Sequence, residues 1–355
     1  MKVALFTIWH VGNYGADLQT CCLAQVLRDW GHEVEVIDLR LSDLSKGNEG
    51  RLKLLVWSFV NAISPRNIKD QIFFNRFIPR SRRYYSAEEV KHDPPVADLY
   101  LVGSDQVWNP SITKQYADIY FLNFDNLKVP MASYASSFGT DCWNGSEELT
   151  SIARRQLALF KKISCREMTG VGILQNVFGV NAENVIDPSL LVSTYNHLLG
   201  NVEQKPIIAY YPLSKNDEAY AFCLRLSKET SMKVRIANWK KMLGKAIWNK
   251  ASMRQWLRTI AEATLVITPS FHGLTTCLTL RKQFVIVITE PLILERSTRI
   301  RDLLKALDLE DRLFTSFEDA WDSRVWETEI DYNKVEKKLS ALRDKSLSFL
   351  HSVLE

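Results

Sequence analysis

Residues 268–273, Thr-Pro-Ser-Phe-His-Gly, bring a hydroxyl, an imidazole and a glycine into one short turn. The apolar run LVIT before the turn predicts a strand and GLTTCLTLR after it predicts a helix, so His272 is expected beside a helix N-terminus. An imidazole in that position suits proton transfer near neutral pH and contact with an anion. The other interpretation, that His272 is a structural histidine of the core, stays open.

Three arginines offer positive charge at predicted strand ends. Arg296 and Arg299 follow the next predicted strand, FVIVI, and are expected to reach the same edge of the sheet as His272. Arg166 ends the short predicted strand in KISCRE. A guanidinium in such a place can grip a carboxylate or a phosphate through two parallel hydrogen bonds. A structural pair with the neighbouring Glu167 is the alternative for Arg166.

The segment GSDQVWNP, residues 103–110, follows a strand predicted over residues 98–102. After the small pair of Gly103 and Ser104 comes Asp105, which can act as a base, hydrogen-bond to sugar hydroxyls or simply cap a helix. Trp108 can stack on a sugar or pack beneath the loop. We favour the functional interpretation, because this combination of residues is unusual for a simple turn.

The loop HVGNYGA, residues 10–16, lies between the first predicted strand and its helix. Its glycines, Gly12 and Gly15, allow a ligand to approach the backbone, and the following helix N-terminus offers N–H groups to an anion. Asn13 stands between them as a polar side chain. The loop matches neither GxGxxG nor a phosphate-binding P-loop, and a tight turn explains it equally well.

Other kinds of site find no support in the sequence. It contains no DxD and no HExxH, and its six histidines lack ligand spacing, so we expect no metal. No GxSxG motif is present. None of the six cysteines forms a CxxC pair, and we interpret them as reduced core residues of a cytoplasmic protein.

Strands and helices alternate along the chain in two series, which predicts two facing, doubly wound, Rossmann-like α/β domains with a C-terminal helical extension. The length of 355 residues also predicts two domains. We place the first over residues 1–199, with a basic helical insertion at about 45–95, and the second over residues 200–300. Helices over residues 301–355 are expected to pack back on the first domain.

The net charge of +4 is concentrated in one segment. Residues 51–83 contain eight Lys and Arg but one acid, a charge of +7, so the rest of the chain sums to −3. A basic, aromatic segment fits a peripheral contact with the inner face of the membrane. We favour a helical insertion with solvated charges, because no amphipathic period is sustained. The charge is too local for nucleic acid, and no window is long and apolar enough to span a bilayer.

The ordered set of these segments resembles the polysaccharide pyruvyl transferase family. The similarity runs through GNYGADLQT, VGSDQVWNP, YFLNF, ASYASSFG, ISCREMTGVGIL, NVIDPSLLVS, SFHG and STRIRDLLKALDLEDR, nearly the whole chain. The resemblance implies a fold like that of the GT-B glycosyltransferases. It also implies transfer of the pyruvyl unit of phosphoenolpyruvate, with no further cofactor, onto a sugar diol of a cell-surface polysaccharide or its lipid-linked precursor.

Roles for the candidate residues follow from this resemblance. His272 would be the general acid or a phosphate contact, Asp105 the base for an acceptor hydroxyl, and Arg166 a holder of the anionic groups. The expected substrate-binding residues are Asn13, Gly15, Ser104, Trp108, Ser270, Arg296 and Arg299. Two other functions share the architecture: a metal-independent glycosyltransferase that uses a nucleotide sugar, and a non-catalytic sugar-binding protein.

Overall fold

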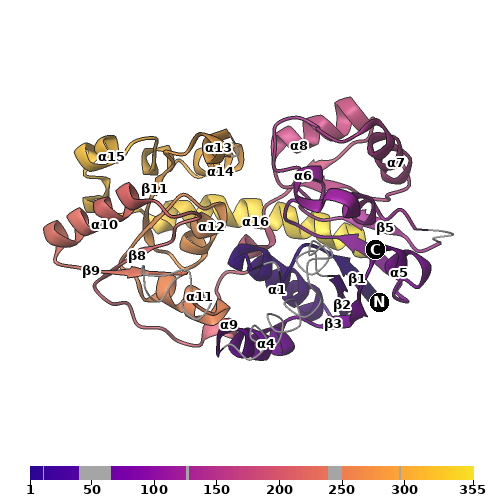
Figure 1. The fold of residues 1–355 in the computed structure, drawn as a ribbon, viewed down its shortest axis with the longest axis horizontal. Coiled ribbons are helices and arrows are strands. Elements are labelled where there is room, and N and C mark those ends of the chain that lie inside the picture. Colours follow the sequence, from indigo (N-terminus) through magenta and orange to yellow (C-terminus); the bar gives the residue numbers. More distant parts are fainter. Residues whose placement is uncertain (11, 40–64, 125–127, 239–249, 296) are drawn as a thin grey trace, which may run out of the picture. The chain divides into compact units, whose positions relative to one another are not determined.

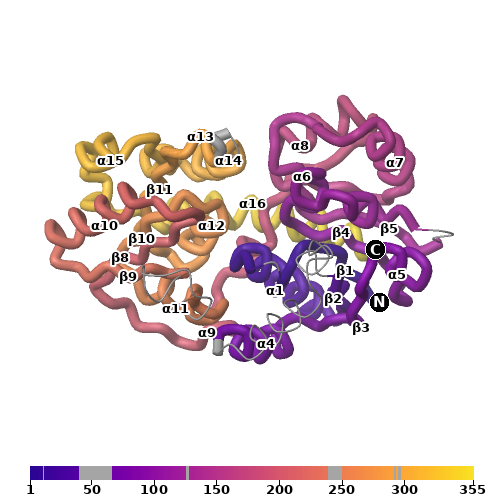
Figure 2. Tube along the Cα trace, in the orientation of Figure 1, coloured from indigo at the N-terminus to yellow at the C-terminus, as the bar shows by residue number. Residues whose placement is uncertain are grey.

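The computed structural model describes residues 1–355 except 11, 40–64, 125–127, 239–249 and 296 (Figure 1). These residues form two compact units, and neither unit is continuous in sequence. The first comprises the described residues of Met1–Asn48, with Asn75–Leu191 and Ala341–Glu355. The second comprises those of Glu49–Phe74, with Val192–Ser340. Figure 2 traces the same path along the Cα atoms.

The first unit contains a five-stranded parallel sheet in the order β3-β2-β1-β4-β5. Its strands are β1 (Lys2–Phe6), β2 (Glu33–Leu39), β3 (Arg80–Tyr84), β4 (Leu99–Val102) and β5 (Met131–Ser133). β4 is buried along its whole length and β1 almost so, as their apolar runs predict for strands covered on both faces. A short pair, β6 (Ser164–Cys165) and β7 (Glu183–Asn184), continues beyond β5 through single bridges.

Helices of this unit connect the strands. They are α1 (Tyr14–Asp29), α4 (Pro65–Phe77, shared between the units), α5 (Ala87–His92), α6 (Pro110–Thr113), α7 (Glu147–Leu157) and α8 (Met168–Ile173), with a 3-10 helix, η1 (Lys114–Phe121), and a π-helical turn, η2 (Leu174–Phe178). α1 is buried nearly all round because its sequence alternates small and apolar residues with few charges.

Strand β3 differs from the helical insertion expected over residues 45–95. Its sequence, RSRRY, contains three arginines and no apolar run, so it lacked the usual strand signal. Only Ser81 and Tyr84 are buried, and the Arg82 guanidinium lies 4.2 Å from the centre of the Tyr84 ring. The polar composition fits an edge strand, which exposes one side.

The second unit contains a five-stranded parallel sheet in the order β12-β11-β10-β8-β9. Its strands are β8 (Ile207–Tyr210), β9 (Lys233–Ile236), β10 (Leu265–Thr268), β11 (Gln283–Val287) and β12 (Leu313–Phe314). The helices are α9 (Asn196–Leu199), α10 (Asp217–Thr230), α11 (Met253–Glu262), α12 (Phe271–Thr279), α13 (Pro291–Glu295), α14 (Thr298–Ala306), α15 (Phe317–Ser323) and α16 (Tyr332–Leu354). The prediction of an α/β architecture in two series is confirmed.

Helix α16 ends the chain and belongs to both units (Figure 1). In the second unit, the Tyr332 hydroxyl donates to the Cys277 carbonyl. In the first, Arg343 Nε donates to the Leu190 carbonyl at 2.9 Å, and Ser346 Oγ accepts from Ile186 N at 3.1 Å. Across the part of the chain that the structure describes, no helix is both long and apolar enough to span a membrane.

Candidate active site

The first sheet has a topological switch point between β1 and β4, where ligands bind in open α/β sheets. The loops after these two strands are joined there. Gly103 N donates to the Phe6 carbonyl and Thr7 Oγ1 donates to the Ser104 carbonyl, each at 2.8 Å. A Cβ on Gly103 would lie 2.9 Å from Leu5 Cδ1 and 3.0 Å from Thr7 Cβ, so a larger residue would displace these buried side chains.

Arg166 lies in a buried cluster of carboxylates beside this switch point. Its side chain is 1% exposed, and its Nη1 lies 2.7 Å from Asp187 Oδ2. Nη2 lies 3.8 Å from Asp105 Oδ1, and Nε lies 3.9 Å from Glu167 Oε2. Burial alone would lower the pKa of Arg166, but the charges of Asp187, Asp105 and Glu167 raise it above its usual range. These are the contacts of a structural ion pair, and its main partner is Asp187 rather than the adjacent Glu167.

Asp187 uses both carboxylate oxygens to tie two loops together. Oδ2 accepts from Arg166 and, at 3.2 Å, from Ser104 Oγ. Oδ1 accepts from Ser189 N at 2.9 Å and from Ser189 Oγ at 2.6 Å. The hydroxyl of Ser104, an expected substrate contact, is therefore directed to Asp187, and Ser104 is fully buried.

Asp105 adopts a left-handed backbone conformation, with φ of 74°. Such a conformation costs a non-glycine residue about 1–3 kcal/mol and is most common at functional sites. Asp105 Oδ1 accepts from Gln106 N at 2.9 Å, and the residue caps no helix, because the cap of α6 is Asn109. The capping interpretation of Asp105 therefore does not apply, and its carboxylate is fixed by Arg166 and by its own turn.

Trp108 packs beneath the loop, the second of the two positions considered for it. Its side chain is fully buried and stacks on Phe121 at 5.8 Å between ring centres, with 3° between the planes. The indole Nε1 donates to the Tyr120 carbonyl at 2.9 Å. The ring supports the loop that carries Asp105, and its face is covered by protein.

Asn13 and Gly15 form the N-terminal cap of α1. Asn13 Oδ1 accepts from Gly15 N at 3.0 Å, and the preceding Gly12 has φ of +77°. Asn13 is exposed, whereas Gly15 is buried. The loop thus combines a turn with an exposed amide at the end of β1.

In the second unit, the switch point lies between β8 and β10. Ser270 caps α12, since its Oγ accepts from Gly273 N at 3.2 Å. His272 follows in the first turn of that helix, with 6% of its surface exposed. A Cβ on Gly273 would lie 2.7 Å from Thr268 Oγ1, so glycine allows α12 to begin directly against the end of β10. His272 thus stands beside a helix N-terminus, as its sequence predicts.

Arg299 comes from α14 to the same place. Its guanidinium carbon lies 5.2 Å from the centre of the Phe271 ring, and that ring lies 5.4 Å from the His272 ring, centre to centre. Arg296 lies outside the described residues. The structure therefore gathers Ser270, His272 and Arg299 in one cluster, and Ser104, Asp105 and Arg166 in another within the first unit.

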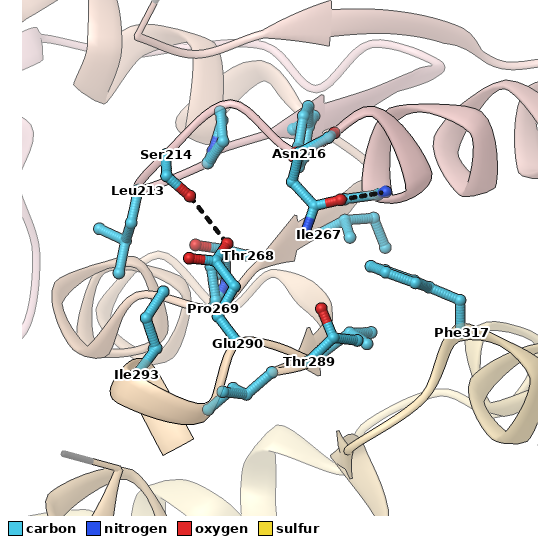
Figure 3. Close-up of a pocket in the computed structure, with 15 residues that line it drawn as sticks. Leu213, Ser214, Asn216, Ile267, Thr268, Pro269, Thr289, Glu290, Ile293 and Phe317 are labelled. Carbon is cyan, nitrogen blue, oxygen red and sulfur yellow. Dashed lines mark hydrogen bonds between the residues drawn. The ribbon is translucent and has the colours of Figure 1, made fainter. Parts of the chain in front are cut away.

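A small pocket of about 20 Å³, with room for about one water molecule, opens at the carboxyl ends of β8, β10 and β11 (Figure 3). Phe317, Ile293 and Leu213 give it apolar walls, and the Ser214 hydroxyl donates to Glu290 Oε1 at 2.7 Å across it. Among the described residues that line the pocket, Glu290 carries the only charge. The pocket is thus suited to hydroxyl donors rather than to anions.

One residue of the first cluster, Asp187, escaped the sequence reasoning. Asp187 stands before a proline in NVIDPS, a pattern typical of a turn, and gave no sign of its distant partner. Glu167 Oε1 accepts from Ser137 Oγ at 2.8 Å and from Phe138 N at 2.9 Å, which fixes the loop after β5. No group of three metal-ligating side chains occurs among the described residues.

The fold of this chain is similar to the folds of solved structures. The chain is similar to a UDP-N-acetylglucosamine 2-epimerase from Rickettsia bellii, with 11% identity and a TM-score of 0.52, over 99% of this chain and 96% of that one. A candidate UDP-N-acetylglucosamine 2-epimerase from Listeria monocytogenes is similar at 11% identity and a TM-score of 0.51, over 100% and 96%. The protein is therefore an α/β protein with a GT-B-like fold.

The sequence matches the model of the family described as polysaccharide pyruvyl transferase over residues 13–291. The chain belongs to the polysaccharide pyruvyl transferase family, and it is a transferase. The match includes all the candidate site residues except Arg296 and Arg299. A comparison with curated proteins found no match.

Proposed function

We propose that this protein transfers the pyruvyl unit of phosphoenolpyruvate to two hydroxyls of a sugar in a cell-surface polysaccharide or its lipid-linked precursor, as a cyclic ketal. The observation that carries the proposal is the cluster at the end of β10. There the imidazole of His272, the N-terminus of α12 and the guanidinium of Arg299 lie together. A donor with both a phosphate and a carboxylate needs cationic contacts and an acid.

The proposed reaction requires one proton to be transferred to a carbon atom of the donor, and all its other atoms and charges are accounted for as follows. An acid protonates C3 of phosphoenolpyruvate, and one sugar hydroxyl adds to C2 and releases its proton. Phosphate then leaves with the bonding electrons, and the second hydroxyl attacks C2 and gives up its proton, which phosphate carries away. The carbon unit keeps its carboxylate and gains a methyl group.

The residues take separate roles in this scheme. His272 protonates C3, and Arg299 contacts the anionic groups of the donor. Asp105 accepts the proton of the acceptor hydroxyl. Arg166, with 1% of its side chain exposed, acts as a positioning residue that holds Asp105 rather than as a substrate contact.

The pocket of Figure 3 fits the acceptor better than the donor. Glu290 would repel a phosphate or a carboxylate, whereas a carboxylate accepts hydrogen bonds from sugar hydroxyls well. We therefore assign this pocket to the edge of the acceptor sugar.

The test is a purified enzyme assay with phosphoenolpyruvate and candidate sugars. It follows phosphate release and the mass gain of one pyruvyl unit on the sugar. His272→Ala should lower the rate ~100- to 10,000-fold, the usual loss on removing a general acid. His92→Ala, at an exposed histidine of α5, is the matched control and should leave the rate unchanged.

Two results would contradict the proposal. One is near-full ketal formation by His272→Ala. The other is thermal stabilisation by UDP- or GDP-sugars but not by phosphoenolpyruvate, because only a ligand of the folded state raises the melting temperature.

A further inference from the structure

Helix α4 (Pro65–Phe77) presents two opposite faces. Phe73 and Phe74 are buried, at 5% and 3% exposure, and they lie on the inner face. On the opposite face Ile68 is 48% and Ile72 is 65% exposed. The two isoleucines are one turn apart, so they form a short apolar strip on the outside of the helix.

Cations flank this strip. Lys69 and Arg76 are exposed, and a period of 3.6 residues puts both on the side of Ile68 and Ile72. The helix contains one acid, Asp70, which is buried on the inner face. Its carboxylate accepts from Met253 N at 2.7 Å and lies 3.2 Å from Arg66 Nε. The outer face of α4 is therefore apolar and positive, with no acid of its own helix to neutralise it.

We infer that this outer face binds an anionic lipid surface. A helix that lies on a membrane presents apolar residues to the acyl boundary and cations to the headgroups, which is the arrangement of Ile68 and Ile72 with Lys69 and Arg76. The cations favour a negatively charged partner because of charge complementarity. The two large aliphatic side chains favour a partner that has an apolar layer beneath its charged surface, as a membrane has. Within the basic window of the sequence, α4 thus places an exposed apolar strip beside cations; residues 51–64 of that window lie outside the described residues.

The inference is independent of the ketal chemistry, because α4 contains none of the residues placed in the candidate active site. It supplies a reason for the enzyme to work at a surface where lipid-linked sugars are found. Loss of lipid binding would leave pyruvyl transfer to a free sugar unchanged, so the two proposals can fail separately.

The experiment is co-sedimentation of the full chain with phosphatidylcholine vesicles that contain or lack phosphatidylglycerol. The protein should bind only the anionic vesicles, and added salt should weaken the binding. Lys69→Gln with Arg76→Gln should reduce the affinity about 30-fold, since each basic residue near such a surface contributes about 1 kcal/mol. Ile68→Ser with Ile72→Ser should also weaken binding, although the net charge is unchanged.

The control neutralises Lys337 and Lys345, two exposed lysines that lie about two turns apart on α16. Lys337→Gln with Lys345→Gln changes the net charge equally and should bind as the wild type does. Equal loss in this control would overturn the inference, since binding would then follow total charge. Equal binding to neutral vesicles, or binding to neither kind, would also overturn it. A further result would also overturn it: the variant Ile68→Ser with Ile72→Ser binds vesicles as the wild type does but has a lower molecular mass in solution. The apolar strip would then be a contact with a second copy of the chain.

Discussion

The ion pair between Arg166 and Asp187 makes a sharp prediction about stability. Arg166→Met and Asp187→Asn keep the side-chain volumes nearly constant and remove one charge each. Asn at position 187 cannot replace the carboxylate, because Arg166, Ser104 and Ser189 all donate to it. Whichever way the amide is turned, its NH2 group faces a donor.

The magnitude follows from burial. Breaking one partner of a buried pair typically costs about 3–5 kcal/mol, because the other charge stays behind without water. After Asp187→Asn, Arg166 still has Asp105 at 3.8 Å and Glu167 at 3.9 Å. After Arg166→Met, three carboxylates remain together without the cation. We therefore expect Asp187→Asn to lower the free energy of unfolding by about 3 kcal/mol, and Arg166→Met to lower it by nearer to 5 kcal/mol.

The assay is thermal and urea unfolding of both single variants and of the double variant. A loss of about 3 kcal/mol lowers the melting temperature of a unit of this size by ~6–12 °C. The double variant should cost less than the sum of the single variants, by at least about 1.5 kcal/mol, since neither charge is then left alone. Lys215→Met is the control, because Lys215 and Asp217 lie at a similar 2.8 Å but are 71% exposed each.

The exposed pair of Lys215 and Asp217 should contribute less than about 1 kcal/mol to the free energy of unfolding, as exposed pairs do. The reasoning is refuted if Asp187→Asn shifts the melting temperature no more than Lys215→Met does. It is refuted equally if the costs of the two single variants simply add in the double variant, because the pair would then carry no coupling.

Three more predictions concern the second unit. Burial alone would raise the pKa of Glu262, but hydrogen bonds from three cations lower it to about 2 from 4.5. The contribution of Glu262 to the free energy of unfolding is therefore present above about pH 4.5 and is lost as the pH falls toward 2. Urea titrations should show that Glu262→Gln flattens this dependence; an unchanged pH profile would contradict it. Gly273→Ala should destabilise by about 1–3 kcal/mol, because the new Cβ meets Thr268, and it should lower kcat by displacing His272; unaltered melting and activity would argue against that packing. Glu290→Gln should raise KM for the acceptor sugar and leave KM for phosphoenolpyruvate unchanged, whereas the reverse pattern in steady-state kinetics would assign the pocket to the donor.

The parts of the fold that the sequence predicts are those with local signals. Leu99–Val102 and Leu265–Thr268 are short apolar runs between polar loops, and both are central strands. The turn at Ser270 and the helix after it also follow from neighbouring residues. Rules of spacing are enough for such elements, since each depends on residues a few positions away.

The parts that the sequence does not predict depend on distant partners. Arg166 looks the same in sequence whether it meets a substrate or Asp187, which is 21 positions further on. Ser104 and Asp187 are 83 positions apart, and no pattern links them. For Trp108 the sequence left two interpretations and favoured the functional one, whereas its contact with Phe121 shows that the ring packs beneath the loop. Arg80–Tyr84 is a strand because the edge of a sheet was available, not because of its own propensity.

Helix α16 has a consequence for the synthesis of the protein. Phe349, Leu350 and Val353 are buried with at most 4% exposure, and they lie in the last seven residues of a unit whose first strand begins at Lys2. A ribosome releases the chain from the N-terminus onward, so this unit lacks part of its core until residues 349–353 emerge. The unit whose synthesis begins first therefore gains its last core residues after the second unit's residues have been made. A nascent chain that stops before α16 lacks core side chains of both units.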